Sequence, residues 1–203
     1  MKIMKIKLVL VLVMGILFTP LAAKKNDAVT AEARVLHITR GIIQKLDANI
    51  VVYKSNPNQL TAMIRQEVLP FIDFTAMSKL TLGKHWRKAS KPQQARFINA
   101  FREMLIKSYG KAMLKYSGST IKAGNSVPSK KPGYVTVRTI VTPKGRSPIT
   151  ANYDVRNKSG DWKAYNIQIA GINLITNFRT NFTREVSTKG LDALITRLER
   201  IKK

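Results

Sequence analysis

Apolar residues recur at helical intervals through the first part of the chain. Between residues 27 and 53 they stand three or four positions apart, which places them on one face of a helix: Val35, Ile38, Ile42, Leu46, Ile50 and Tyr53. A second helix is predicted to begin after Asn56, whose side chain can cap it, with Pro57 in its first turn. Because proline interrupts a helix, this second helix should end at Pro70.

The same spacing predicts two further helices before the middle of the chain. The shorter one lies within residues 71–82 and stops before Gly83. The longer one begins at Ser90 and stops at Gly118, and its stripe is the most regular in the sequence: Phe97, Phe101, Leu105, Ser108, Ala112 and Tyr116.

After Gly118 the period of the pattern shortens to two residues, which is typical of strands with one apolar face. Three runs show it: Val135, Val137 and Val141; Ile149, Ala151, Tyr153 and Val155; Tyr165, Ile167 and Ile169. Short turn segments at residues 143–145 and 157–160 separate the runs, so neighbouring strands should pair antiparallel. Residues 119–127 are a candidate fourth strand.

Helical spacing returns after Gly171. One stripe precedes Gly190 and a short one follows it: Ile175, Phe178, Phe182 and Val186, then Leu191, Leu194, Ile195 and Leu198. Helices followed by strands and then helices predict an α+β fold, with a curved antiparallel sheet of about four strands covered by several helices. We expect one domain over residues 24–203, mainly helical over 24–117, a sheet over 118–170 and C-terminal helices over 171–203.

The N-terminus has the pattern of an export signal. Lys2, Lys5 and Lys7 precede an uninterrupted apolar run over residues 8–18, and small residues follow up to Ala23. Eleven apolar residues are too few for a bilayer span, which needs roughly 20. We therefore expect cleavage near Ala23 and a soluble protein outside the cytoplasm. The sequence contains no cysteine, so disulfides are excluded.

The charge is strongly positive, with 36 Lys and Arg against 11 Asp and Glu and a formal net charge of +25. Such a balance often indicates nucleic acid binding, but export argues against that partner. Anionic lipid headgroups, lipopolysaccharide and acidic proteins are the alternatives outside the cytoplasm. A charge that serves only solubility stays open, since the basic residues are spread over every segment.

Two segments resemble the MlaC family, also called the toluene-tolerance auxiliary family. Residues 68–113 contain Asp73-Phe74, a Gly83 to Arg87 step, and a helix that reads Gln94-Ala95-Arg96-Phe97 and continues to Tyr109. Residues 161–182 contain a strand, a glycine and a helix with the step Asn177-Phe178-Arg179. Together with the leader and the order of the elements, the resemblance covers nearly all of residues 24–203.

The resemblance implies a periplasmic phospholipid carrier without catalytic activity. It implies an NTF2-like or cystatin-like shape, an apolar cavity between sheet and helices that shelters the acyl tails, and bound phospholipid as cargo rather than a cofactor. It also implies two partners that maintain outer-membrane lipid asymmetry: an inner-membrane ABC transporter complex with its substrate-binding domain protein, and an outer-membrane lipoprotein and porin complex. The alternative is a basic periplasmic adaptor with a solid core, which binds acidic proteins or lipopolysaccharide.

Candidate walls of the cavity are apolar residues of the inner sheet face and of the helices. From the sheet they are Val135, Val137, Tyr153, Val155, Ile167 and Ile169. From the helices they are Phe74, Met77, Phe101, Leu105, Ile172, Ile175 and Phe178. Ordinary core packing is the competing interpretation for each of them. Three cations are candidates for a headgroup phosphate or an acidic partner, although each could equally be solvated: Arg87, Arg138 and Arg179.

Little else in the sequence points to chemistry. The two histidines, His37 and His85, have no neighbouring carboxylate that would form a relay, and no acid or histidine spacing predicts a metal site. Asp73 is expected to cap the helix that follows it. No nucleophile and base pair can be nominated, so no enzyme is predicted.

Overall fold

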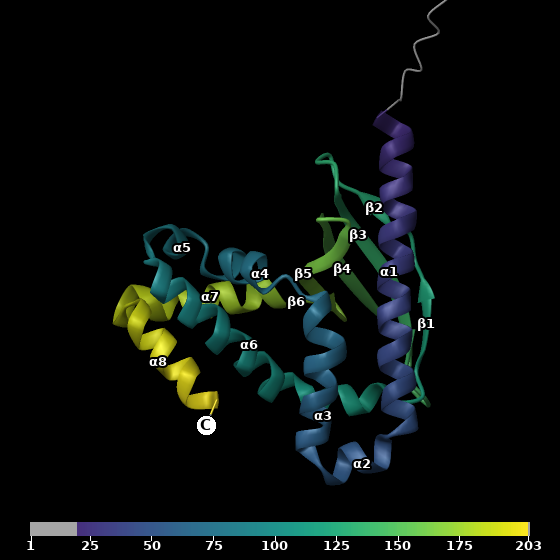
Figure 1. Cartoon of the computed structure of the whole chain (residues 1–203), viewed down its shortest axis with the longest axis horizontal. Helices are drawn as coiled ribbons and strands as arrows, with labels where there is room; N and C mark the ends of the chain where they lie inside the picture. Colours follow the sequence, from purple (N-terminus) through teal and green to yellow (C-terminus); the bar gives the residue numbers. More distant parts are fainter. Residues whose placement is uncertain (1–19, 203) are drawn as a thin grey trace, which may run out of the picture.

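The computed structural model describes residues 20–202, and the side chains within 26–201. Most of the predicted export signal lies outside these residues, so the leader and its cleavage stay predictions. Helices come first in the chain, strands follow, and two helices end it (Figure 1). The helices are α1 (Pro20–Ala48), α2 (Ile50–Ser55), α3 (Pro57–Met63), α4 (Phe74–Leu82), α5 (Lys84–Lys88), α6 (Lys91–Met113), α7 (Leu174–Lys189) and α8 (Leu191–Lys202).

Three short helical segments complete this part of the chain. A π-helical turn, η1 (Ile64–Val68), and a 3-10 turn, η2 (Leu69–Phe71), continue α3, and a second 3-10 turn, η3 (Leu114–Tyr116), continues α6. The strands are β1 (Thr120–Ala123), β2 (Val127–Pro128), β3 (Tyr134–Thr142), β4 (Ile149–Lys158), β5 (Asp161–Ile169) and β6 (Ile172–Asn173).

Side-chain caps fix where the helices begin. The Asn56 side chain accepts hydrogen bonds from the backbone N–H groups of Asn58 and Gln59, as its position before Pro57 predicts. Ser90 and Gln93 form a reciprocal capping box at the start of α6. Helix α5 was not predicted. It becomes possible because Gly83 adopts a left-handed φ of 54°, which turns the chain between α4 and α5.

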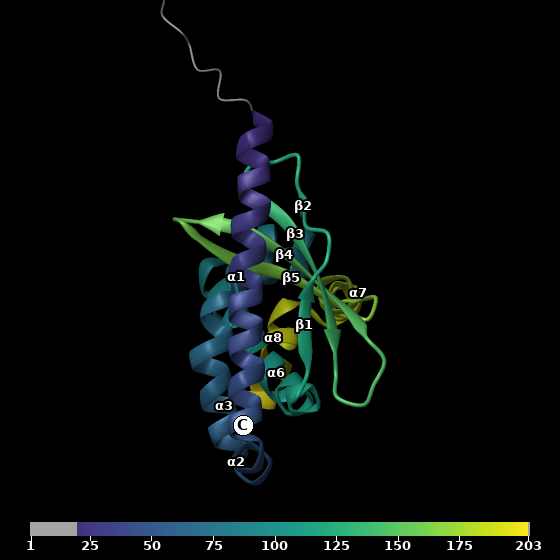
Figure 2. The same cartoon turned by 90° about the vertical axis from the view of Figure 1, so that its right-hand side faces the viewer.

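The described strands form one antiparallel sheet in the order β1-β3-β4-β5-β6, and β2 also pairs with β3. The predicted α+β class is confirmed, but the sheet has six strands rather than about four, because β2 and β6 are two-residue strands too short to show a period. Figure 2 shows α1 running along the sheet. The prediction of one helix to Tyr53 also needs correction, because the helix is interrupted at Asn49, between α1 and α2.

A bulge changes the inner face of β5. The register shifts between Asp154 and Val155, so that Tyr153 pairs with Ile167 whereas Val155 pairs with Ala164. Tyr165 is the extra residue, and its ring packs edge-on against that of Tyr134 at 5.9 Å. The expectation that Tyr165 continues the apolar face of Ile167 and Ile169 is therefore wrong. Trp162 and Ala164 occupy the buried positions before the bulge instead: both belong to the core.

The apolar interior is divided into separate clusters. The helical cluster joins α4, α6, α7 and α8 around buried Phe97, Phe101 and Phe182. The sheet cluster joins α1 and Phe71 to the part of the inner sheet face that includes Val135 and Val137. Two smaller clusters join α1 to the end of the sheet near β1, and α1 to α2, α3 and α6. We call α4 to α8 the helical half and the sheet with α1 the sheet half. Each half contains one large cluster, and the cluster that joins α1 to α6, together with Ile72, connects them.

Candidate functional site

The predicted wall residues fall into three groups by burial. Six are buried within packed clusters, three on the sheet (Val135, Val137 and Val155) and three in the helical cluster (Met77, Phe101 and Ile175). Six are half-buried: Phe74, Leu105, Tyr153, Ile167, Ile169 and Phe178. The remaining one, Ile172, is 60% exposed.

Ile172 requires a correction. It was expected on a helix, but it lies on strand β6, where it pairs with Ile169. The helix begins only at Leu174, because the side chain of Asn173 caps it by accepting a hydrogen bond from the backbone N–H of Thr176 at 3.0 Å. With its side chain largely in solvent, Ile172 does not line an interior wall in this structure.

The six half-buried residues come from elements at the boundary between the two halves (Figure 1). On the sheet, Tyr153 lies opposite Ile167, and Ile169 lies one inward position further along β5. On the helical side, the ring of Phe178 packs against Phe101 at 5.3 Å and against the half-exposed Tyr109 at 6.3 Å. Each half therefore presents apolar surface that its own core leaves partly uncovered.

Tyr153 shows how apolar this boundary is. Its ring lies 6.4 Å from that of Phe71 and contacts both clusters of the sheet half. Burial, with a smaller contribution from Tyr116, raises the pKa of Tyr153 to about 12. The phenol is therefore neutral at physiological pH, and the middle of the inner sheet face carries no charge.

Asp73 links the two halves. Its carboxylate caps α4 by accepting a hydrogen bond from the backbone N–H of Ala76 at 3.0 Å, which confirms the predicted capping role. The same carboxylate pairs with Arg156 on β4, whose Nε lies 2.8 Å away, and the Asp73 backbone N–H bonds the carbonyl of Ala164 on β5. Although burial opposes its ionisation, the Ala76 N–H and Arg156 lower the pKa of Asp73.

Sequence reasoning missed the partner of Asp73. Arg156 lies on the outer face of the sheet, where it is paired with Tyr134, and nothing in the local pattern of β4 indicates a contact with a helix 83 positions earlier. The alternation of β4 was one available signal, because it places Arg156 on the sheet face opposite to that of its buried neighbour Val155.

The three candidate arginines do not converge. Arg179 on α7 donates from Nε to the carbonyl of Leu80 at 2.7 Å, so it caps the end of α4. Arg138 is exposed on the outward positions of β3, and Arg87 is exposed on α5. No phosphate site assembled from these three residues is present, and their headgroup role stays a prediction.

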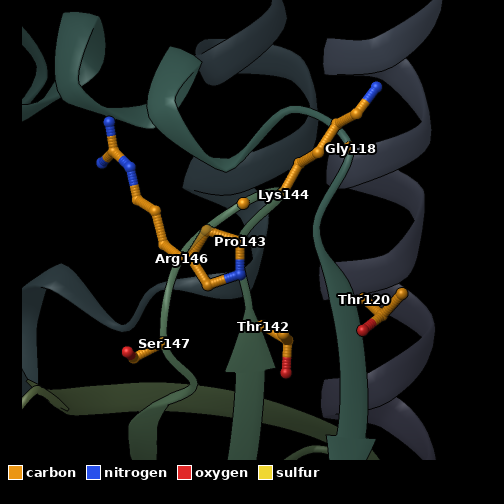
Figure 3. A pocket seen from close by; sticks show the side chains of 8 residues that line it. Gly118, Thr120, Thr142, Pro143, Lys144, Arg146 and Ser147 are labelled. Carbon is orange, nitrogen blue, oxygen red and sulfur yellow. The ribbon is translucent and has the colours of Figure 1, made fainter.

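Two surface hollows lie away from the predicted walls. The larger, of about 820 Å³, is formed by the start of β1, the end of β3 and the turn that follows, with Lys144 and Arg146 at its rim (Figure 3). The other, of about 560 Å³, follows one side of α1 and includes Leu36 and His37. Neither includes any of the thirteen candidate wall residues.

Two features are absent from the part of the chain that the structure describes. Within it, no helix combines the length and apolarity that a bilayer crossing requires. Likewise, no three His, Cys, Asp or Glu side chains among the described residues gather in a way that could hold a metal ion.

The architecture is that of a class of proteins that includes a phospholipid-binding protein. A solved structure of the phospholipid-binding protein from Ralstonia solanacearum, in complex with a phospholipid, superposes with a TM-score of 0.77. The match covers 85% of this chain and 96% of that protein at 22% sequence identity, so it defines the shared fold.

The family is defined by sequence. The model of the MlaC protein family matches residues 37–200, and the chain belongs to this family. It is 31% identical over 157 residues to the toluene tolerance protein ttg2D of Pseudomonas putida, covering 76% of this chain and 72% of that protein. It is 26% identical over 161 residues to the intermembrane phospholipid transport system binding protein MlaC of Haemophilus influenzae, covering 78% and 75% respectively.

Proposed function

We propose that the protein is a periplasmic phospholipid carrier. The observation that carries the proposal is membership of the MlaC family over residues 37–200, joined by relatives named for phospholipid transport and phospholipid binding. The half-buried apolar residues of the sheet and of the helices support it, because they offer partly uncovered apolar surface. The protein acts by binding and release, without catalysis and without a cofactor.

The energetics of the cargo explain what such a site must provide. Two acyl tails contain roughly 30 methylene groups, and exposing them to water costs on the order of 20 kcal/mol. A carrier lowers this cost only if the tails contact apolar side chains along most of their length. The tails would lie against the partly exposed apolar side chains between the sheet and helical clusters, while both clusters keep their packing.

We assign the tails to the half-buried residues rather than to the buried ones. Tyr153, Ile167 and Ile169 would form one wall, and Phe74, Leu105 and Phe178 the other. Val137 and Phe101 are fully enclosed by their own clusters, so they would hold the walls in place without touching cargo. A neutral Tyr153 suits this wall, since a charge there would repel acyl chains.

The setting of the carrier follows from the predicted leader and from the family. After export and cleavage near Ala23, residues 24–203 would act as one lipid-binding domain in the periplasm. The donor and acceptor would be an inner-membrane ABC transporter complex with its substrate-binding domain protein, and an outer-membrane lipoprotein and porin complex. Exchange between them would maintain outer-membrane lipid asymmetry. Nucleic acid is not a partner.

The test is extraction of the protein, purified from the periplasm without detergent, into organic solvent, followed by mass spectrometry of the extract. We expect phospholipid at about one molecule per protein. A protein that is purified without phospholipid and does not bind added phospholipid would contradict the proposal and favour a basic adaptor with a solid core. A sample washed in high salt before extraction is the control for phospholipid held only by the surface charge.

A further inference from the structure

The segment that joins α4 to α6 is strongly basic. Residues 74–102 contain seven Lys and Arg and no Asp or Glu. Five of these cations are exposed on the last turns of α4, on α5 and at the start of α6, and we call them the basic end: Lys79, Lys84, Arg87, Lys88 and Lys91. Figure 1 shows α5 at one extreme of the long axis of the molecule.

The acids of the helical half pair with other cations, and the one beside this segment, Asp192, also accepts a hydrogen bond from Gln93 Nε2 at 2.8 Å. Arg96 pairs with Asp192 and Glu199 on α8, and Arg197 pairs with Glu185. Glu103 pairs with Arg65 of the π-helical turn. These pairs lie along η1, α6, α7 and α8, and no ion pair found among the described residues includes a member of the basic end. The positive charge at this end is left for a partner outside the chain.

Two neighbouring residues show that the cations act together. The pKa of His85 is lowered by burial first, and then by the charges of Lys84 and Lys88. Arg179 reaches the same end from α7, where its Nε lies 3.8 Å from the position a Cβ on Gly83 would take. The basic end thus gathers charge from helices that are distant in sequence.

We propose that the basic end docks the protein on the surface of an anionic phospholipid bilayer. This rests on the proposed carrier function, which brings the protein to membranes. The lysine side chains of the basic end are exposed, and neither described hollow lies there. A planar anionic surface requires reach and charge, but no shape complementarity.

An acidic protein is the competing partner, and the structure favours the bilayer over it. A protein interface of ordinary size is built around buried aromatic or arginine anchors in pockets. At the basic end Trp86 packs back against the helical cluster, and its carbonyl accepts from Gln94 Nε2 at 3.0 Å. The exposed groups are therefore cations with little apolar surface between them, which suits adsorption to headgroups.

The test compares two triple variants that remove the same charge from opposite ends. The first, Lys84→Gln, Arg87→Gln and Lys88→Gln, changes the basic end. The control, Lys115→Gln, Lys122→Gln and Lys144→Gln, changes exposed lysines on η3, β1 and the turn after β3. Binding is measured at low salt by cosedimentation with vesicles of phosphatidylglycerol and phosphatidylcholine, and with phosphatidylcholine alone.

We expect wild type and the control variant to bind the anionic vesicles and neither to bind neutral ones. The basic-end variant should bind about a hundredfold more weakly, since each cation near an anionic surface changes the affinity roughly fivefold. Equal loss in both variants would reduce the effect to net charge and overturn the proposal, as would absence of wild-type binding. Phospholipid recovered from the purified basic-end variant should match wild type, so this result is independent of the carrier function.

Discussion

The helical half and the sheet half bury their apolar residues in different ways. In the helical half, Phe97, Phe101 and Phe182 pack with ring centroids 5.5 to 6.0 Å apart, and α8 closes the cluster. In the sheet half, α1 covers Val135 and Val137 completely but leaves the strand positions nearer the helical half partly exposed. The helical half therefore leaves only side chains at the margin of its core partly exposed, whereas the inner sheet face is covered along only part of its length.

The largest effect on stability should come from a cavity in the core of the helical half. Phe101→Ala removes a ring that is 1% exposed and contacts three other phenylalanines. We expect the free energy of unfolding to fall by about 4 kcal/mol, because the variant loses the transfer free energy of the ring and leaves a cavity in the core. Urea denaturation followed by circular dichroism measures it. A loss below about 1 kcal/mol would show that the helical cluster is loosely packed.

Next in size is the link between the halves. Asp73→Ala removes a carboxylate that is 4% exposed, together with its bond to Arg156 and the cap of α4. We expect a loss of about 3 kcal/mol. The matched control is Asp161→Ala, whose partners Arg34 and Lys163 lie at the surface, so its loss should stay below about 1 kcal/mol. Equal losses of stability in the two variants would show that Asp73 stabilises the protein no more than a surface ion pair does.

The Asp73 link also has a pH dependence of known sign. Its pKa is lowered in the folded protein, so its contribution is complete above the unfolded value of about 3.8 and is lost as the pH falls through the lower folded value. The difference in stability between wild type and Asp73→Ala should therefore shrink in acid. A difference that stays constant from neutral pH to strong acid would show that the carboxylate charge is not involved.

A pair of enlarged side chains sharpens the contrast within the sheet. Val137→Trp inserts a ring into the covered part of the inner face and should cost about 2 kcal/mol by overpacking. Ile167→Trp inserts the same ring at a half-buried position, and we expect under about 1 kcal/mol. The second variant should also retain much less phospholipid, because the ring takes the place of a tail. Similar costs at both positions would contradict an uncovered boundary.

The smallest effect concerns Arg179. Its guanidinium caps the end of α4 through the Leu80 carbonyl, so Arg179→Gln should lower stability by about 1 kcal/mol or less. Its phospholipid content should be that of wild type, because this geometry assigns it a structural contact. A selective loss of lipid at unchanged stability would instead restore the predicted headgroup role.

The sequence was sufficient for elements whose signals are local. The stripe from Phe97 to Tyr116 and the caps at Asn56, Asp73 and Ser90 identified helices at their observed starts. Non-local geometry was not predictable. The bulge that turns Tyr165 off the inner face depends on pairing with β4, and the Asp73 to Arg156 link joins positions 83 residues apart.

The candidate site shows the same limit. Alternation along β3 and β4 predicted which positions face inward, but not that α1 would cover Val135, Val137 and Val155 while Tyr153 stays half-buried. Which strand residues are covered depends on where α1, about 100 residues earlier in the chain, packs on the sheet. The alternation within the strands carries no information on that position. Ile172 was misplaced because a two-residue strand cannot be told from the first turn of the helix after it.

The most direct test of the account is to map where acyl tails lie. The protein is loaded with a phospholipid that has a photoreactive diazirine within one acyl chain, irradiated, digested and examined by mass spectrometry. We predict crosslinks on β4 and β5 at Tyr153, Ile167 or Ile169 and on α6 or α7 at Leu105 or Phe178. Crosslinks confined to the outer sheet face or to the basic end would contradict a site between the two halves.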